Sequence, residues 1–338
     1  MALTLEDIAK ISGFSRSTVS RVINGDKRVS ESTREAILTV IQNLNFQPNL
    51  AARGLAAGRT GILGLVLPVG VSTIFADPFF PILISNISLA CNGLDYVVML
   101  WMAEPGYEKR MISKIIYNGL VDGVIVSSNE IDNPIVNALA ESKMPFVLIG
   151  RHPTNPQVNF IDVDNRHAAR EAVQHLIRQG RRRIAAITGP QNKMVGCDRY
   201  MGYQDALQKN GIPFNSDLVV ESDFSEEGGK KAAERLLAQK PDAIFAASDL
   251  MAIAALRVFQ NAGYVVPQDV AVMGFDDIPL ATQTNPPLTT IRQPTDLMGR
   301  MAVEMIVGMI NHPEKQEARH IILPVDLVIR SSCGSGDI

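Results

Sequence analysis

Hydroxyl and guanidinium side chains near the start of the chain have the chemistry to bind DNA. Residues 15–21 read SRSTVSR. Arginine can make two hydrogen bonds to O6 and N7 of guanine, so Arg16 and Arg21 are candidates for reading bases. Ser17, Thr18 and Ser20 can donate to phosphate oxygens or to base edges. The same residues would also suit the solvent-exposed face of any small helical domain, so this pattern alone leaves both interpretations open.

Three short helices are expected to position these side chains. Hydroxyl residues that can cap a helix precede each helical stretch: Thr4, Ser15, and Ser30 or Ser32. The expected helices cover Leu5–Ser12, Arg16–Asn24, and a stretch that ends near Leu44. Asp7 would add an imperfect capping box to the first helix, and Gly13 would end that helix in the left-handed conformation. Apolar residues at helical spacing predict one small shared core: Ile8, Ala9, Val19, Val22, Ile37, Val40, Ile41 and Leu44.

A weak helical segment follows Pro48. Residues 49–57 read NLAARGLAA and could form one short helix, with Asn49 as N-cap and Gly58 as the stop. Gly54 inside it costs about 1 kcal/mol relative to alanine. A segment this short with an internal glycine does not hold a helix alone in water. We therefore expect it to become ordered only when something else supports it.

From Gly61 onward, apolar β-rich runs alternate with helical stretches. This alternation is typical of βαβ units and of a parallel sheet covered on both faces. The expected strands are Ile62–Leu67, Tyr96–Trp101, Gly123–Val126, Phe146–Ile149, Ile184–Thr188, Ala243–Ala246 and Val270–Met273. The pattern is too long for one compact sheet, so two similar lobes are expected. The pattern therefore divides the chain into a small helical part over 1–46, a connecting segment over 47–60, and an α/β body over 61–332.

The distribution of charge separates the two ends of the chain. The 338 residues carry a net charge of −3, but residues 1–60 hold eight Lys and Arg against five acidic residues, which makes that end +3 and the remainder −6. A basic module joined to an acidic domain fits a protein whose N-terminal end faces DNA.

The three cysteines and five histidines show no metal or disulfide spacing, so no metal and no cofactor are expected. No signal peptide and no run of about 20 apolar residues is evident, so a cytoplasmic protein without membrane contact is expected.

The whole chain resembles the lac repressor (LacI/GalR) family of transcriptional regulators. The N-terminal segments that carry the resemblance are TLEDIA (4–9), Gly13, STVSRVIN (17–24), VS-x-STRE (29–35) and LNFQPN–A-R-L (44–55). The later ones are DGVIV (122–126), ITGP (187–190), Arg199-x-x-Gly202-Tyr203, SDLMA-x-A (248–254), VPQDVAVMGFDD (266–277), PPLTTIRQP (286–294) and LPVDLVIR (323–330). The resemblance implies an α-helical helix-turn-helix domain followed by an α/β two-lobed domain with parallel sheets, like that of periplasmic binding proteins. It also implies that residues 1–46 are the DNA-binding domain, 47–60 the hinge helix and linker, and 61–332 an effector-binding and dimerisation domain. Implied chain crossings place lobe one at about 61–161 and 292–322, and lobe two at about 162–291 and 323–332.

The resemblance implies a role in DNA binding for particular residues. Arg16 and Ser17 occupy the positions that vary most with operator sequence, and Arg21 matches an arginine that reads bases. Residues that match phosphate contacts are Thr18, Ser20, Asn24, Ser30, Thr33 and Asn49. Leu55 matches a hinge-helix leucine that wedges into the minor groove, with an ordinary core residue as the alternative. Thr4, Leu5 and Arg53 complete the expected DNA-binding set.

The resemblance also implies a small effector, most simply a sugar, at the carboxyl ends of the strands between the lobes. The expected effector contacts are Phe79, Phe80, Ser127, Arg151, Lys193, Arg199, Phe224, Ser248 and Asp276. Arg199 and Asp276 match residues that bond effector hydroxyls, while the aromatic residues suit apolar sugar faces. One of the two phenylalanines at 79–80 is expected in the core, and Asp249 and Asp277 are expected to begin helices rather than to bind ligand.

The charge of the effector stays open at this point. Arg151, Lys193 and Arg199 would form a cationic rim, which allows an effector that carries a phosphate or a carboxylate. Asp276 would oppose such an anion.

The resemblance therefore implies a repressor that binds a palindromic operator as a homodimer and is controlled by effector-driven closure of the lobes. The absence of a C-terminal heptad tail favours a dimer over a tetramer. A transport solute-binding protein is opposed by residues 1–60 and by the missing signal peptide. An enzyme is opposed by the lack of GxGxxG and GxSxG motifs. A regulator controlled by a protein corepressor remains an alternative, although the polar and aromatic cleft residues favour a small ligand.

Overall fold

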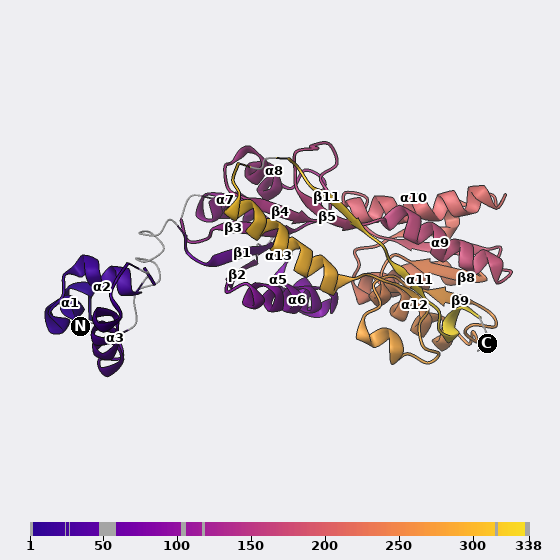
Figure 1. Ribbon diagram of the computed structural model, residues 1–338. Helices are drawn as coiled ribbons and strands as arrows, with labels where there is room; N and C mark the ends of the chain where they lie inside the picture. Colours follow the sequence, from indigo (N-terminus) through magenta and orange to yellow (C-terminus); the bar gives the residue numbers. More distant parts are fainter. Residues whose placement is uncertain are drawn as a thin grey trace. The chain divides into compact units, whose positions relative to one another are not determined.

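The computed structural model describes residues 3–23, 25–26, 28–46, 59–102, 106–116, 119–314 and 317–334. The chain forms two compact units, Met1–Gly61 and Ile62–Ile338, and each is described below by itself (Figure 1). The expected hinge helix at 49–57 lies outside the described residues.

The N-terminal unit contains helices α1 (Leu5–Ser12), α2 (Arg16–Ile23) and α3 (Glu31–Asn43) around one small core. Thr4 and Asp7 form a complete capping box at α1, where the sequence suggested an imperfect one. Gly13 ends α1 with φ 75°, as predicted. Ser30, rather than Ser32, caps α3. The core is made by buried apolar side chains of the three helices and the following turn: Ile8, Val19, Val22, Ile37 and Phe46.

A parallel sheet forms the first half of the larger unit, which we call lobe one. Among the described residues the strand order is β11-β5-β4-β3-β1-β2. The bounds are β1 (Ile62–Leu67), β2 (Val97–Met102), β3 (Gly123–Ser127), β4 (Phe146–Ile149), β5 (Phe160–Val163) and β11 (His320–Leu323). Helices α5 (Val71–Ala76), α6 (Phe79–Gly93), α7 (Glu108–Ile116), α8 (Pro134–Glu141) and α13 (Thr295–Asn311) accompany it.

The alternation of side chains along these strands assigns the helices to the two faces of the sheet. Leu63, Leu65 and Leu67 of β1 pack against α6 and α13, whereas Val66 packs with residues of α7 and α8. Figure 1 shows α13 and α6 together beside the strands. Both faces of the sheet are thus buried, which explains why its central strands are continuous apolar runs.

The second sheet belongs to the other half, which we call lobe two. Its strand order is β7-β6-β8-β9 among the described residues. The strands are β6 (Ile184–Thr188), β7 (Val219–Glu221), β8 (Ala243–Ala246) and β9 (Ala271–Met273). Helices α9 (Asn165–Arg178) and α10 (Met194–Lys209) share one core cluster, and α11 (Glu226–Leu237) and α12 (Asp249–Asn261) share another. Short 3₁₀ helices lie at Ser216–Leu218, Pro279–Thr282 and Ser331–Cys333.

The described chain passes between the lobes at more than one place. It leaves the first sheet after β5, returns through β10 (Thr290–Arg292) to α13, and leaves again after β11 for β12 (Asp326–Val328). Strands β10 and β12 pair antiparallel between the two sheets. Each lobe is therefore assembled from separate stretches of sequence, and the cleft between them is bordered by these crossing strands.

DNA-contact surface and interlobe cleft

Helix α2 presents its polar residues to solvent because its apolar residues face the core. Val19 and Val22 are buried, whereas Arg16, Ser17 and Arg21 are exposed. Thr18 and Ser20 are half-buried on the flanks of the same helix. The residues predicted to read bases are therefore accessible from one side of a rigid, packed element.

The N-terminal ends of the three helices supply a second kind of polar group. The Thr18 amide donates to Ser15 Oγ at 3.2 Å, and the Thr33 amide donates to Ser30 Oγ at 3.4 Å. Thr4 likewise caps α1, and Leu5 packs against the core beside it. The positive end of a helix dipole suits a phosphate oxygen, most of all at α2, whose first turn holds no acidic residue, whereas α1 and α3 carry Glu6, Asp7 and Glu31 there.

Arg16 lies at the start of α2, next to Glu6 of α1. The Nε atom of Arg16 lies 2.8 Å from Oε1 of Glu6, and both side chains are more than half exposed. The remaining predicted DNA contacts, Asn24, Asn49, Arg53 and Leu55, lie outside the described residues.

Arg199 of α10 is buried in the body of the protein, close to Asp276. Its Nε donates to Asn165 Oδ1 at 2.9 Å, and its Nη1 donates to the Ala247 carbonyl oxygen at 2.6 Å. Nη1 also lies 3.4 Å from Asp276 Oδ1. The guanidinium lies over the ring of Phe275, 3.5 Å from its centroid. Burial lowers the pKa of Arg199, although the surrounding carboxylates oppose that shift.

Asp276 has an unusual backbone conformation for a residue with a side chain. Its φ of 122° lies in a region that glycine normally occupies, and such strain is retained mainly at functional sites. The Gln293 amide donates to Asp276 Oδ1 at 2.7 Å. Burial raises the pKa of Asp276 to about 7, with Arg199 acting in the opposite direction and Asp77 adding to the rise. The strained backbone thus holds a buried, easily protonated carboxyl group beside Arg199.

Asp77 belongs to the same cluster and was not predicted from the sequence. It follows α5, and its Oδ1 accepts a hydrogen bond from the Phe79 amide at 3.0 Å. Burial raises the pKa of Asp77, while the charges of Arg199 and Lys193 lower it. Its position could have indicated a site residue from the sequence, because the segment that follows the first strand lies at the carboxyl end of a parallel sheet, where ligands bind.

Aromatic side chains predicted as effector contacts lie in both lobes, and Phe79 borders the groove described below. The ring of Phe224 lies against Gly189, so closely that a Cβ there would be 2.1 Å from its Cζ atom. Lys193 Nζ lies 5.8 Å from the centroid of the same ring. Phe79 and Phe80 meet edge to face, with centroids 5.6 Å apart, and both also pack against the core of lobe one.

A groove of about 520 Å³ lies along the crossing segments, and Phe79, Asp276 and Gln293 contribute to its wall. Two predicted contacts, Ser127 at the end of β3 and Ser248 at the start of α12, are buried. Ser248 is the N-cap of α12 and accepts from the Met251 amide at 3.4 Å.

Asp249 and Asp277 were both predicted to begin helices, and the structure agrees with this for Asp249 alone. Asp249 begins α12, as predicted, and accepts hydrogen bonds from Thr290 and from the Ile278 amide. The prediction that Asp277 begins a helix was wrong. The following 3₁₀ helix has Ile278 as its N-cap, and the Asp277 carboxylate instead pairs with Arg292 at 2.7 Å and with Arg330 at 2.6 Å. Two arginines from distant parts of the chain satisfy this carboxylate, which local sequence could not reveal.

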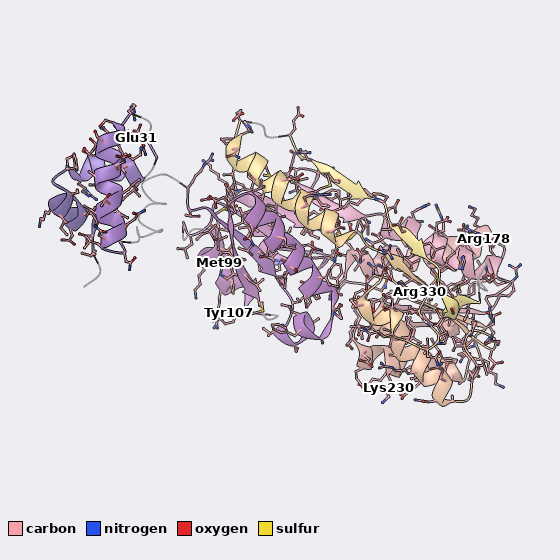
Figure 2. The ribbon with its side chains drawn as sticks, turned by 60° about the horizontal axis from the view of Figure 1, so that its bottom comes forward. Glu31, Met99, Tyr107, Arg178, Lys230 and Arg330 are labelled. Carbon is pink, nitrogen blue, oxygen red and sulfur yellow. The ribbon has the colours of Figure 1, made fainter. Side chains whose placement is uncertain are left out.

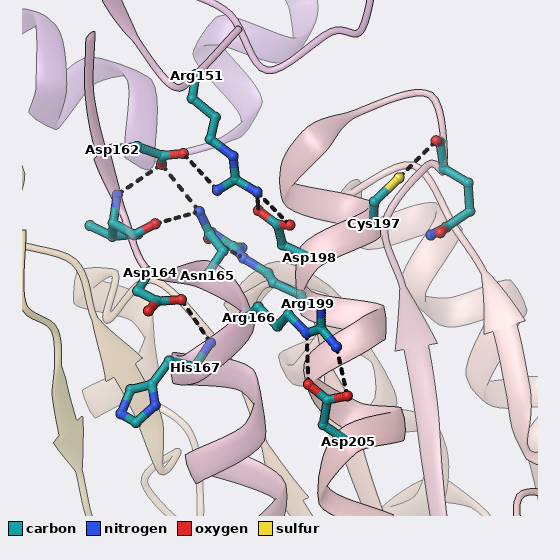
Figure 3. A network of polar contacts seen from close by, with 12 residues as sticks. Arg151, Asp162, Asp164, Asn165, Arg166, His167, Cys197, Asp198, Arg199 and Asp205 are labelled. Carbon is teal, nitrogen blue, oxygen red and sulfur yellow. Dashed lines mark hydrogen bonds and ion pairs between the residues drawn. The ribbon is translucent and has the colours of Figure 1, made fainter. Parts of the chain in front are cut away.

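Arg151 connects the lobes rather than standing alone at the rim. Its Nη2 donates to Asp198 of α10 at 2.6 Å, and its Nη1 donates to Asp162 of β5 at 3.4 Å (Figure 3). Burial raises the pKa of Asp162 to about 6, and Arg151 opposes that rise. The positive charge of Arg151 is thus offset by two buried carboxyl groups. The cationic rim expected from the sequence is in fact interspersed with acids.

A polar chain leads from this ion pair to Asp276. The Asn165 amide nitrogen donates to Asp162 at 3.2 Å, its oxygen accepts from Arg199, and Arg199 reaches Asp276. Figure 3 shows the part of this chain that runs from Arg151 to Arg199.

A short backbone bridge also joins the lobes. The Ile131 amide donates to the Asn192 carbonyl oxygen at 2.9 Å, and the Met194 amide donates to the Asn129 carbonyl oxygen at 2.7 Å. The two lobes therefore meet through both backbone and side-chain contacts at the edge of the cleft.

The described residues contain no group of His, Cys, Asp and Glu that could hold a metal ion. Within the same residues, no helix has the length and apolar character needed to cross a membrane.

Comparison with known proteins agrees with this arrangement. Residues 4–49 match the model of bacterial regulatory proteins of the lacI family, and residues 173–333 match a periplasmic binding protein-like domain. The HTH-type transcriptional regulator CelR of Thermobifida fusca is 40% identical over 97% of this chain and 98% of its own length. The HTH-type transcriptional repressor PurR of Photobacterium profundum is 32% identical over 97% of this chain and 98% of that protein.

Solved structures show the same relationship. A complex of the regulator CelR with cellobiose has a TM-score of 0.77 and 38% identity, over 98% of this chain and 99% of that one. The lac repressor dimer bound to operator and the anti-inducer ONPF has a TM-score of 0.87 and 27% identity, over 98% of this chain and 99% of that one.

Proposed function

The chain belongs to the lacI family of bacterial regulatory proteins and is a DNA-binding transcriptional regulator. From that premise we propose that it is a repressor that binds a palindromic operator as a homodimer and releases it when a neutral sugar closes the cleft. The observation that carries the sugar proposal is the buried pair Arg199–Asp276, because Asp276 lines the groove together with Phe79 of the other lobe.

The DNA-binding part of the proposal assigns roles within the N-terminal unit. Arg16, Ser17 and Arg21 read bases, because they are exposed along one packed helix. Thr4, Thr18, Ser30 and Thr33 bind phosphates, because they lie at or near capped helix ends, and Ser20 does so from the flank of α2. Leu55 enters the minor groove between half-sites, a role that rests on its family position alone.

The acidic character of the cleft favours a neutral sugar over an anion. Asp77, Asp162 and Asp276 lie among the three basic groups that the sequence suggested as a rim. Carboxylates and a guanidinium bind paired hydroxyls, whereas a phosphate would meet repulsion from the carboxylates. The cellobiose complex of CelR supports a sugar of this kind, and cellobiose is the first ligand to test.

The dimeric lac repressor supports a dimer of this chain on DNA. A two-fold symmetric operator would then match two N-terminal units. Because the target of such a regulator is chromosomal DNA, we place the protein in the cytoplasm.

One experiment separates the two parts of this proposal. Operators are selected from random palindromic DNA with the full-length chain, and binding is followed by fluorescence anisotropy with and without cellobiose, ribose, their phosphates and purine bases. We expect a neutral sugar to weaken operator binding by about 5–150-fold, the range of typical allosteric coupling. Selection of no sequence would contradict the DNA part. A selected operator whose affinity only a phosphorylated sugar or a purine changes would contradict the neutral-sugar part.

A further inference from the structure

We propose that Glu6 positions Arg16 and thereby sets the base preference of the recognition helix. The proposal rests on the role of Arg16 in reading bases. It adds a residue that need not touch DNA itself.

The two side chains come from different helices that pack together. Glu6 lies in the first turn of α1, and Arg16 is the first residue of α2. The Arg16 Nε atom and the Glu6 Oε1 atom are 2.8 Å apart. The neighbouring carboxylate of Asp7 already accepts from the Thr4 amide at 2.9 Å and from the Thr4 hydroxyl at 2.7 Å. The two adjacent acids thus have separate tasks, one in the helix cap and one beside Arg16.

Because Glu6 contacts the Nε atom of Arg16, the two terminal nitrogens of the guanidinium stay available for a base. A guanidinium has one Nε and two terminal nitrogens in a planar fork. Glu6 lies against Nε, and within the described residues the ion pair with Glu6 is the only polar contact of the Arg16 side chain. The two terminal nitrogens can therefore face O6 and N7 of a guanine while Glu6 remains in place.

Glu6 also supplies a reason for selectivity. A free arginine is a flexible side chain that can move to the nearest phosphate, which carries no sequence information. A carboxylate held beside Nε restrains the rotamers of Arg16 before DNA arrives. A recognition site becomes specific when neighbouring residues fix the rotamer of the side chain that contacts the base. Without them, the site only attracts the phosphate backbone.

If Glu6 instead competed with DNA for Arg16, its removal would change the preference for guanine in the opposite direction. Glu6 could compete with DNA for Arg16, so that the ion pair must break before guanine is bound. In that case, removing the carboxylate would strengthen binding to guanine. The Nε contact favours support over competition, because it leaves the terminal nitrogens available.

The test compares Glu6→Gln with a matched variant, Glu31→Gln, in the full-length chain without effector. Glu31 lies in the first turn of α3 and is exposed, 3.8 Å from Arg34, and Figure 2 shows it at the surface of the N-terminal unit. Each variant removes one negative charge from the same unit. The readout is the dissociation constant for the operator with the Arg16-dependent guanine changed to adenine, divided by the dissociation constant for the selected operator. The guanine in question is the one at which the Arg16→Ala variant loses its preference over adenine.

We expect Glu6→Gln to lower this ratio by about tenfold, within the range of a lost bidentate contact, and Glu31→Gln to leave it unchanged. Both variants should bind all DNA somewhat more tightly, since each loses a charge that repels phosphate. Glu6→Gln should have no further effect on the ratio in an Arg16→Ala background.

Three outcomes would overturn the proposal. An unchanged or raised ratio in Glu6→Gln, with Arg16→Ala still losing the preference, rejects Glu6 as a positioning residue and leaves the reading role of Arg16 intact. An equal loss in Glu31→Gln assigns the effect to net charge. Arg16→Ala with an unaltered base preference rejects the reading role of Arg16 and with it the proposal.

Discussion

The guanidinium of Arg151 in lobe one donates to the carboxylate of Asp198 in lobe two at 2.6 Å. This ion pair crosses the cleft at the point where the polar chain through Asp162, Asn165 and Arg199 begins. A change in the distance between the lobes would therefore alter the surroundings of Arg199 directly. The pair connects the closure of the cleft with the residues proposed to bind the sugar.

Replacing Arg151 with Met should destabilise the protein and weaken sugar binding. The substitution leaves the buried Asp162 and Asp198 without their common partner, and an uncompensated buried carboxylate is costly. Because Arg151 is itself partly exposed, we expect a loss of about 1–3 kcal/mol in the free energy of unfolding, measured with urea. Arg166→Met is the matched control. Its ion pair with Asp205 is exposed and lies within lobe two, so a loss below about 1 kcal/mol is expected. Equal losses in the two variants would show that the interlobe pair has no special role.

Asp276→Asn should abolish most of the response to sugar while preserving the operator affinity of the free protein. The amide keeps the size of the side chain but loses a charged acceptor beside Arg199. We expect the affinity for the sugar to fall at least tenfold, by titration calorimetry, since hydrogen bonds to charged groups contribute about 1.5–3 kcal/mol. A variant that still responds at the same sugar concentration would remove Asp276 from the effector site.

The affinity for the sugar should rise with pH across neutrality. Burial raises the pKa of Asp276 to about 7, so its ionised form, the stronger acceptor, becomes the major form only above that pH. Titrations from pH 6 to pH 8 should show tighter binding at the higher pH in the native chain and a weaker pH dependence in Asp276→Asn, where Asp162, with its pKa raised to about 6, still titrates.

The stability of the protein should change with pH in the opposite direction. A carboxyl group whose folded pKa is raised binds its proton more tightly when folded, so folding is favoured at low pH and this contribution is lost as pH rises from about 4 to about 7. In urea unfolding, Asp276→Asn should therefore lose less stability than the native chain between pH 5 and pH 7. A steeper fall in the variant would contradict the raised pKa.

Gly189→Ala should disturb the aromatic wall of the cleft. The added Cβ would lie 2.1 Å from Cζ of Phe224, so the ring must move. We expect a loss of about 1–3 kcal/mol in stability and weaker sugar binding. Gly93→Ala, at the end of α6, meets no atom within 4 Å and is the matched control, with little change expected in either measurement.

Leu55→Gly should weaken operator binding at least tenfold and leave sugar affinity nearly unchanged. Inserting an apolar wedge offsets the cost of unstacking a base step, and glycine cannot do this. Anisotropy with the selected operator, together with calorimetry for the sugar, checks both halves of the prediction. Equal operator affinity in the variant would contradict the wedge role.

The sequence predicted the central strands well because those strands are buried on both faces. The bounds of β1, β4, β6 and β8 agree with the apolar runs. Strands β5, β7, β10, β11 and β12 were not predicted. They are three or four residues long and include polar residues, so neither length nor periodicity distinguishes them from loops.

The candidate site was predicted less completely than the fold. Family motifs indicated Arg199, Asp276 and Phe224 of lobe two, of which Asp276 lines the groove. The partners of Arg151 and Asp277 were not predictable, because Asp198, Arg292 and Arg330 are brought to them only by tertiary packing. Asp77 carried a signal in its position after the first strand, but a single aspartate before a proline is also common in loops.

The interleaving of the two lobes has a consequence for how the protein is made. The six-stranded sheet includes β11 at residues 320–323, and β12 at residues 326–328 pairs with β10. Neither pairing can form until the ribosome has synthesised almost the entire body. The helices of the N-terminal unit, with their own small core, can fold much earlier. A nascent chain would thus fold the helix that carries Arg16, Ser17 and Arg21 long before the body proposed to bind the sugar is complete.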